Sequence, residues 1–316
     1  MEDYPRTLQE FEGRFTSEEA CREYLARLRW PEGFVCPQCD GQAAWRTARG
    51  LFRCKACDHQ ASITAGTIFQ DSHLPLRTWF RAVWWVTSQK TGASALGLQR
   101  ILGLGSYRTA WALLQKLRRA MVRPGRDRLS GRVEVDESYV GGEEEGVRGR
   151  KTRKKALVVI AAQEDSTRIG RIRMGRVSSA SKANLHRFVL GAVEPGSVVH
   201  TDAWRSYEGL DGKGYTHEVT VLKSCEQGVD MLPRVHRAAS LLKRWLMGTH
   251  QGAVSNEHLD FYLDEFVFRF NRRTSRHRGK LFYRLVQHSV ATGPETYSSM
   301  VQGVRGRRPR KPQDRG

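Results

Sequence analysis

The sequence lacks any long run of apolar residues. Its most apolar stretch, Trp79–Val86, is short and is interrupted by Arg81. A membrane-spanning helix needs about 20 consecutive apolar residues, so no segment is expected to cross a bilayer. The N-terminal residues are acidic and also lack an apolar run, which argues against a secretory signal peptide. The chain is nevertheless 39% hydrophobic over 316 residues, enough for two or three globular domains.

Acidic residues are in the minority. The chain has 33 Asp and Glu residues against 53 Lys and Arg residues, which gives a formal net charge of +20. Such an excess favours a polyanionic partner, because Lys and Arg neutralise phosphates and thereby supply most non-specific affinity for nucleic acid. A ribosome-like or merely soluble basic surface is the alternative. The basic, Pro- and Gly-rich tail at 303–316 is predicted to be disordered.

Cysteine is scarce as well, and four of the six cysteines form two CxxC pairs. Two such knuckles match a closed tetrahedral zinc site, which stabilises a segment too small to build its own core. A redox-active pair is the alternative, and the presence of a second knuckle argues against it. Residues 31–70 are therefore predicted to form a zinc ribbon, with a hairpin that turns at Arg49-Gly50. The expected zinc ligands are Cys36, Cys39, Cys54 and Cys57, whereas Cys21 and Cys225 are expected to be dispensable for zinc.

Helices are predicted on both sides of the ribbon. Residues 1–30 predict a short amphipathic N-terminal helix whose N-cap is Ser17. Residues 75–123 predict a helical segment in which two helices are joined by the short turn Gly103-Leu104-Gly105. This arrangement is typical of a helix-turn-helix, and Arg108 would then lie at the exposed start of the DNA-recognition helix. An ordinary helical linker is the alternative.

Residues 131–300 predict alternating strands and helices, so the expected fold class is multidomain α/β. The order strand, strand, strand, helix, strand, helix is typical of a ribonuclease-H-like domain with a mixed sheet. Asp136 in the first strand and Asp202 at the end of the fourth would then lie side by side. Two close carboxylates repel each other unless cations neutralise them, and two Mg²⁺ or Mn²⁺ ions suit both oxygen ligands and phosphoryl transfer. Two surface acids at strand ends are the alternative.

Four longer motifs accompany the double CxxC. They are VEVDESYVGG at 133–142, HTDAWRSY at 200–207, HRAASLLKRWLMGTHQG at 236–252 and YLDEFVFRFNRR at 262–273. From about residue 15 to about residue 290, the chain resembles insertion-sequence transposases of the family numbered fifteen-ninety-five, the ISXO-two-like group. The resemblance implies a DDE-type transposase, in which a zinc ribbon precedes a ribonuclease-H-like domain that binds two Mg²⁺ or Mn²⁺ ions. Such an enzyme cleaves and joins double-stranded DNA at element ends and target, as a homo-oligomer in the bacterial cytoplasm, in association with the nucleoid.

The resemblance assigns the two aspartates to the first two catalytic positions and His236 to the third. Relatives carry Glu or Asn there, seven residues before a Lys, which is the spacing between His236 and Lys243. Imidazole can bind a metal ion, although it is a softer ligand than carboxylate. Glu257 and Glu265 are alternative third acids. Both fall in 256–273, where the pattern predicts an amphipathic helix with a charged outer face.

Basic side chains near the site are expected to contact DNA phosphates close to the scissile bond. Lys243 and Arg244 follow His236 on one predicted helix, whereas Arg272 and Arg273 end the last motif. A solvated basic face is the alternative for all of them. Two other functions also stay open: a non-catalytic, domesticated zinc-ribbon DNA-binding protein, which needs neither aspartate, and a different nuclease on the same fold.

Overall fold

The computed structural model describes residues 2–123, 125–141, 155–221, 230–252 and 254–302. The chain forms two compact units: unit 1 comprises Met1–Pro124 and Ser275–Gly316, and unit 2 comprises Gly125–Thr274. Both the predicted tail at 303–316 and Cys225 lie outside the described residues. Within the described ranges, no helix has the length and apolar character that a bilayer crossing requires.

Unit 1 begins with two helices, α1 (Leu8–Arg14) and α2 (Glu18–Arg29), where the sequence predicted a single N-terminal helix. Ser17 caps α2 as predicted, because its hydroxyl accepts a hydrogen bond from the backbone N–H of Ala20 at 3.2 Å. The ribbon contributes β1 (Ala44–Arg46), β2 (Phe52–Cys54) and β3 (Gln60–Ala61), which form an antiparallel sheet in that order. The predicted hairpin joins β1 to β2. Gly50 provides its turn with a φ of +75°, a conformation that favours glycine.

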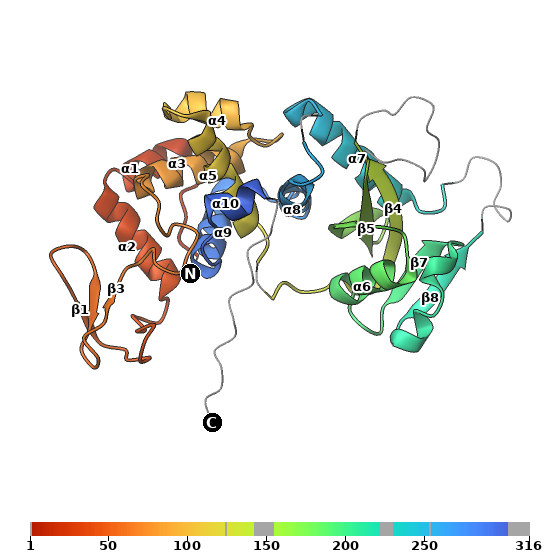
Figure 1. The fold of residues 1–316 in the computed structure, drawn as a ribbon, viewed down its shortest axis with the longest axis horizontal. Helices are drawn as coiled ribbons and strands as arrows, with labels where there is room; N and C mark the ends of the chain where they lie inside the picture. The colour runs from red at the N-terminus through yellow and green to blue at the C-terminus, as the bar shows by residue number, and fades with distance from the viewer. Residues whose placement is uncertain (1, 124, 142–154, 222–229, 253, 303–316) are drawn as a thin grey trace. The chain divides into compact units, whose positions relative to one another are not determined.

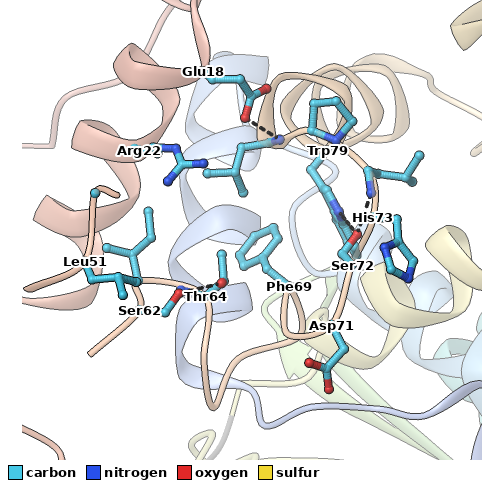
Figure 2. A pocket seen from close by; sticks show the side chains of 15 residues that line it. Glu18, Arg22, Leu51, Ser62, Thr64, Phe69, Asp71, Ser72, His73 and Trp79 are labelled. Atoms are coloured by element: carbon cyan, nitrogen blue, oxygen red, sulfur yellow. Dashed lines mark hydrogen bonds between the residues drawn. The ribbon is translucent and has the colours of Figure 1, made fainter. Parts of the chain in front are cut away.

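The first turn of α3 (Leu76–Ser88) is held by a glutamate from another helix. Its N-cap position is Pro75, which makes no side-chain cap hydrogen bond. The Glu18 carboxylate of α2 instead accepts hydrogen bonds from the backbone N–H groups of Leu76 at 2.9 Å and Arg77 at 2.8 Å. Figure 2 shows Glu18 and Trp79 among the residues that line a cleft of about 420 Å³ within unit 1. The contact fixes α2 against the start of α3.

The C-terminal helices complete the core of unit 1. Helix α9 (Arg278–Ala291) packs against α2, α3 and α5 (Tyr107–Ala120), and α10 (Tyr297–Val301) packs against α5. The sequence instead placed residues up to 300 in the domain that starts at 131. The C-terminal helices belong to unit 1 because of hydrophobic packing. Phe282 of α9 is fully buried among aromatic residues from the first part of the chain. Its ring centroid lies 5.4–6.2 Å from those of Phe11, Phe15, Tyr24, Phe80 and Trp84.

Unit 2 is built on a five-stranded mixed sheet with the order β6-β5-β4-β7-β8. Strands β4, β5 and β6 form an antiparallel meander, whereas β7 and β8 run parallel to β4. The strands are β4 (Arg132–Val140), β5 (Ala156–Asp165), β6 (Arg168–Val177), β7 (Val198–Asp202) and β8 (Thr216–Thr220). Together with the ribbon and the helices, this sheet confirms the predicted multidomain α/β fold class.

Helices cover both faces of this sheet (Figure 1). Helix α6 (Lys182–Ala192) packs on one face, over a core that includes Val133 and Val135 of β4. Helices α7 (Pro233–His250) and α8 (Leu259–Phe270) pack on the other face, over alternate residues of β5 such as Ile160. Because successive strand residues point to opposite faces, Glu134 and Asp136 lie on the α7 face.

Candidate active site

Asp136 and Asp202 lie on adjacent parallel strands. The pairing of β4 with β7 matches Glu134 with His200, and the same register continued by two residues brings Asp136 opposite Asp202. Both aspartates are two residues beyond a matched pair, so both point to the α7 face of the sheet. The structure therefore brings the two predicted acids together.

The electrostatics of Asp136 are unfavourable for its ionised form. Burial raises the pKa of this carboxyl and the neighbouring Asp202 carboxylate raises it further, although the Glu137 backbone N–H and His236 act in the opposite direction. A divalent cation would relieve the repulsion between the two carboxylates. Their hard oxygen atoms are the donors that Mg²⁺ and Mn²⁺ prefer, so the pair fits such an ion.

His236 of α7 faces the same pair. Its Nε2 atom lies 3.3 Å from Oδ2 of Asp136, and its Nδ1 atom lies 2.5 Å from Oδ1 of Asp230. In metal sites, a histidine ligand commonly donates its second ring N–H to a carboxylate, which fixes the tautomer and the ring orientation. Asp230 meets this description, and sequence reasoning did not single it out, because the motif that carries His236 begins only at His236.

The two alternative third acids have other surroundings. Glu265 is 1% exposed and forms an ion pair with Arg269, one turn further along α8, at 2.8 Å. The prediction of a charged outer face was therefore wrong for Glu265, because nearly every residue of α8 is buried. Glu257 is exposed and precedes the helix. Among the three candidates for the third position, His236 is the one for which the structure shows a contact with Asp136.

Glu134 connects the strand of Asp136 to the helix of His236. This carboxylate is 2% exposed. It accepts hydrogen bonds from the backbone N–H groups of Arg234 at 2.7 Å and Val235 at 3.0 Å, and from the Arg234 guanidinium at 2.8 Å. Glu134 thus caps the N-terminus of α7, where a negative charge is favourable. The cap holds His236 at a fixed position along β4.

Glu137 has a different partner on the opposite face of the same strand. Its Oε2 atom accepts a hydrogen bond from the Tyr207 hydroxyl at 2.7 Å. Burial, and then the Glu137 carboxylate, raise the pKa of Tyr207, so this phenol stays protonated and can donate. Tyr207 ends the motif that contains Asp202, and the bond therefore fixes the segment after β7 to β4.

The four ribbon cysteines form a compact cluster in unit 1. Their Sγ atoms all lie within 4.8 Å of one another, and the Cys36–Cys57 and Cys39–Cys54 pairs are each separated by 3.6 Å. Four thiolates around one zinc ion, with Zn–S bonds of about 2.3 Å, would be about 3.8 Å apart, so the cluster fits zinc. Among the residues that the structure describes, it is the one group of three or more metal-binding side chains whose ligand atoms all lie within 4.8 Å of one another.

The first two predicted phosphate-binding residues are exposed on α7. Lys243 and Arg244 follow His236 by two helical turns and point to solvent. Arg272 and Arg273, in contrast, pack on aromatic rings of α8, with centroid distances of 4.1 Å each. The Arg273 guanidinium also donates to backbone carbonyl oxygens of Ile169, Gly170 and Phe270. Arg273 therefore joins α8 to β6 within unit 2.

The predicted helix-turn-helix segment consists of α4 (Ala95–Leu102), a turn, and α5. Gly103 ends α4 with a φ of +62°, and Ser106 caps α5 by accepting a hydrogen bond from the Arg108 N–H at 3.2 Å. Tyr107 and Arg108 are exposed at the start of α5, as predicted. The Arg108 guanidinium lies 3.9 Å from the ring centroid of Tyr297 in α10, a contact that the sequence did not indicate.

Two family models match the chain. Residues 128–271 match the ISXO2-like transposase domain, and residues 16–60 match the transposase zinc-ribbon domain. A protein of Halobacterium salinarum, described as an uncharacterized protein in transposable element ISH50, is 30% identical over 289 residues, which cover 84% of this chain and 94% of that protein. The first match contains both aspartates and His236, and the second contains the four cysteines. The chain belongs to the ISXO2-like family of insertion-sequence transposases.

Proposed function

We propose that the protein cleaves DNA at the ends of its insertion element and joins the cut ends to target DNA by DDE-type phosphoryl transfer. The observation that carries this proposal is the nearness of Asp136 and Asp202 on the adjacent parallel strands β4 and β7, with His236 of α7 in contact with Asp136. The sheet order β6-β5-β4-β7-β8 also supports a ribonuclease-H-like domain, the fold on which the sequence predicted this chemistry.

Asp136, Asp202 and His236 would hold two Mg²⁺ or Mn²⁺ ions. When bound, the ions activate the attacking oxygen and stabilise the leaving oxygen of an in-line displacement. In cleavage, a water oxygen bonds to phosphorus as the bond to the 3′-oxygen breaks. In strand transfer, the freed 3′-hydroxyl attacks a target phosphate in the same manner. Asp230 orients His236 by accepting from Nδ1, and Glu134 holds the helix on which His236 lies.

Double-stranded DNA is the proposed partner. The net charge of +20 favours it, and Lys243 and Arg244 are exposed on α7 beyond His236, where DNA phosphates would pass. The segment α4–α5 would recognise the element ends through the exposed start of α5. Because two ends must be held together for joining, the active species would be a homo-oligomer, and its place would be the bacterial cytoplasm and nucleoid.

Strand cleavage and strand transfer on labelled element ends, with Mg²⁺ or Mn²⁺, test this function. We expect Asp136→Asn and Asp202→Asn each to abolish both reactions and to leave binding to the ends intact, because each removes a charge that holds the metal ions. Glu208→Gln, which changes an exposed acid near Asp202, is the matched control and is expected to react normally. Unimpaired cleavage by either aspartate variant would refute the assignment. End binding by the wild type without cleavage in either metal would instead favour a non-catalytic DNA-binding protein.

A further inference from the structure

A cavity of about 530 Å³ lies in unit 2 next to the segment that follows Asp202. The backbone N–H of Trp204, which lines the cavity, donates to Oδ1 of Asp202 at 3.0 Å. Tyr139, three residues after Asp136 on β4, also lines the cavity, and its side chain lies on the face of the sheet opposite to that of Asp136. At about 3.3 Å per residue, Tyr139 is about 10 Å from Asp136 along the strand. Lys155, Arg176 and Ser179 also line the cavity.

The walls of this cavity combine aromatic, cationic and hydroxyl groups. Trp204 is 39% exposed, and its indole N–H donates to the backbone carbonyl of Ala180 at 3.3 Å, which holds one edge of the ring. Arg176 lies 3.6 Å from Asp260 and remains partly exposed. Ser178, Ser179 and Ser181 also line the cavity, and their hydroxyl oxygens accept hydrogen bonds from Asn184. An aromatic face beside cations and hydroxyls matches a nucleotide, which has a stackable base and an anionic phosphate.

The position of the cavity indicates which nucleotide it would take. The distance of about 10 Å from Asp136 corresponds to about three stacked base steps of 3.4 Å. A DNA strand whose phosphate lies at Asp136 and Asp202 would therefore reach the cavity within a few nucleotides. A base that is paired in a duplex cannot enter such a cavity, so the nucleotide there would be unpaired.

We propose that this cavity binds an unpaired nucleotide of the DNA strand that is cut at Asp136 and Asp202, with its base stacked on Trp204 and its phosphate near Arg176. The proposal rests on the proposed function, since it takes the aspartate pair as the place of the scissile phosphate. The contribution to function is positional: the bound nucleotide holds the strand in register with the two carboxylates and separates it from its complement.

Affinity measurements without divalent cation test the stacking, because no strand is cut under these conditions. The probes are duplexes of the element end that carry a few unpaired nucleotides at the cleavage position, with bases present or replaced by abasic residues. The wild type is expected to bind the base-bearing DNA about 5- to 150-fold more tightly than the abasic DNA, the usual effect of one stacked base. Trp204→Ala is expected to bind both DNAs at the abasic level, and Trp204→Phe is expected to keep most of the difference.

Trp45→Ala is the matched control, because Trp45 is a tryptophan of similar exposure, 45%, in the zinc ribbon. It is expected to keep the full preference for bases. The proposal is overturned if Trp204→Ala keeps the preference, or if it weakens both DNAs equally, since a structural role would not depend on the base. If the wild type cleaves DNA but shows no preference for base-bearing over abasic DNA, the nucleotide pocket is refuted and the proposed transposase function is still supported. If the wild type prefers base-bearing DNA but does not cleave DNA in Mg²⁺ or Mn²⁺, the result counts against the proposed transposase function instead.

Discussion

At the scale of single residues, three acids of β4 carry three separate contacts. Glu134 accepts hydrogen bonds from the start of α7, Asp136 lies beside Asp202 and His236, and Glu137 accepts from Tyr207 on the opposite face. The side-chain alternation of a strand decides which face each acid reaches. The partner on that face then decides whether the carboxylate supports the structure or stays available for a cation.

His236 offers a direct test of the third position. We expect His236→Ala to reduce cleavage severely and His236→Glu to retain or raise it with Mg²⁺, because Glu supplies a hard oxygen ligand of the kind that Mg²⁺ prefers. Asp230→Asn is expected to lower activity less than His236→Ala, since it removes only the group that orients the ring. Cleavage rates with Mg²⁺ and with Mn²⁺ would be measured for each variant.

The matched control for this series is Glu257→Gln, because Glu257 is exposed and its change costs no buried contact. Glu265→Gln is less suitable, since it would break the buried pair with Arg269. If Glu257→Gln stopped cleavage while His236→Ala did not, the third ligand would lie near α8. A loss of stability in both His236 variants, without any dependence on the metal, would indicate a structural histidine.

Lys243 and Arg244 can be tested through the salt dependence of DNA binding. The logarithm of the binding constant falls with the logarithm of salt concentration by about 0.9 for each phosphate contact. We expect Lys243→Ala and Arg244→Ala each to reduce this slope by about 0.9. Arg187→Ala, an exposed change on α6 at the other face of the sheet, is expected to leave it unchanged. Equal slopes in all four proteins would place Lys243 and Arg244 outside the DNA interface.

At the scale of elements, two of the helices that lack a capping side chain of their own, α3 and α7, are capped from another element. Pro75 precedes α3 and Leu232 precedes α7, and neither side chain makes a cap hydrogen bond. Each helix is capped by a glutamate from another element instead, Glu18 for α3 and Glu134 for α7. A cap from a distant element links two elements as well as satisfying the free N–H groups of the first turn. In unit 2, that link sets the position of the helix that carries His236.

Glu134→Gln is expected to loosen α7. It removes the charge from a buried ion pair with Arg234 and weakens the cap, which should cost about 3 kcal/mol of unfolding free energy. Hydrogen exchange of α7 amides and denaturant unfolding would measure the effect. Glu18→Gln is the matched control, since it should loosen α3 and leave α7 protected. Unchanged protection of α7 in Glu134→Gln would show that the cap does not hold the helix.

At the scale of the whole molecule, the first and last described parts of the chain share one core. Phe282 of α9 lies among aromatic rings of α1, α2, α3 and the segment between α1 and α2. Phe282→Ala is expected to destabilise unit 1 by about 3–5 kcal/mol, the usual cost of removing a buried phenyl ring. Unfolding followed by hydrogen exchange would show earlier opening of α2, α3 and α9. Equal destabilisation of the β4–β5 core would contradict the division into two units.

Many local features could be predicted from the sequence because neighbouring residues decide them. The cap of α2 by Ser17, the turn at Gly50 and the limits of β7 follow from side chains within a few positions. The adjacency of Asp136 and Asp202 could also be expected, because the order of the elements is typical of a ribonuclease-H-like domain, in which these two strands would be neighbours. The β3 and β8 strands were not predicted, because each is short and lacks a clear apolar alternation.

Residue spacing in the sequence was enough to predict the zinc knuckles, and strand alternation was enough to predict that Glu134 and Asp136 share a face, because both depend on residues close together in the chain. The adjacency of Asp136 and Asp202 was expected from the ribonuclease-H-like order of elements. Only the tertiary structure decided that Glu134 caps α7, that Asp230 contacts His236 and that α9 belongs to unit 1. The physical reason is that a carboxylate or a phenyl ring has many possible partners of equal chemistry along the chain. Packing selects one of them, and that choice depends on contacts between residues far apart in sequence.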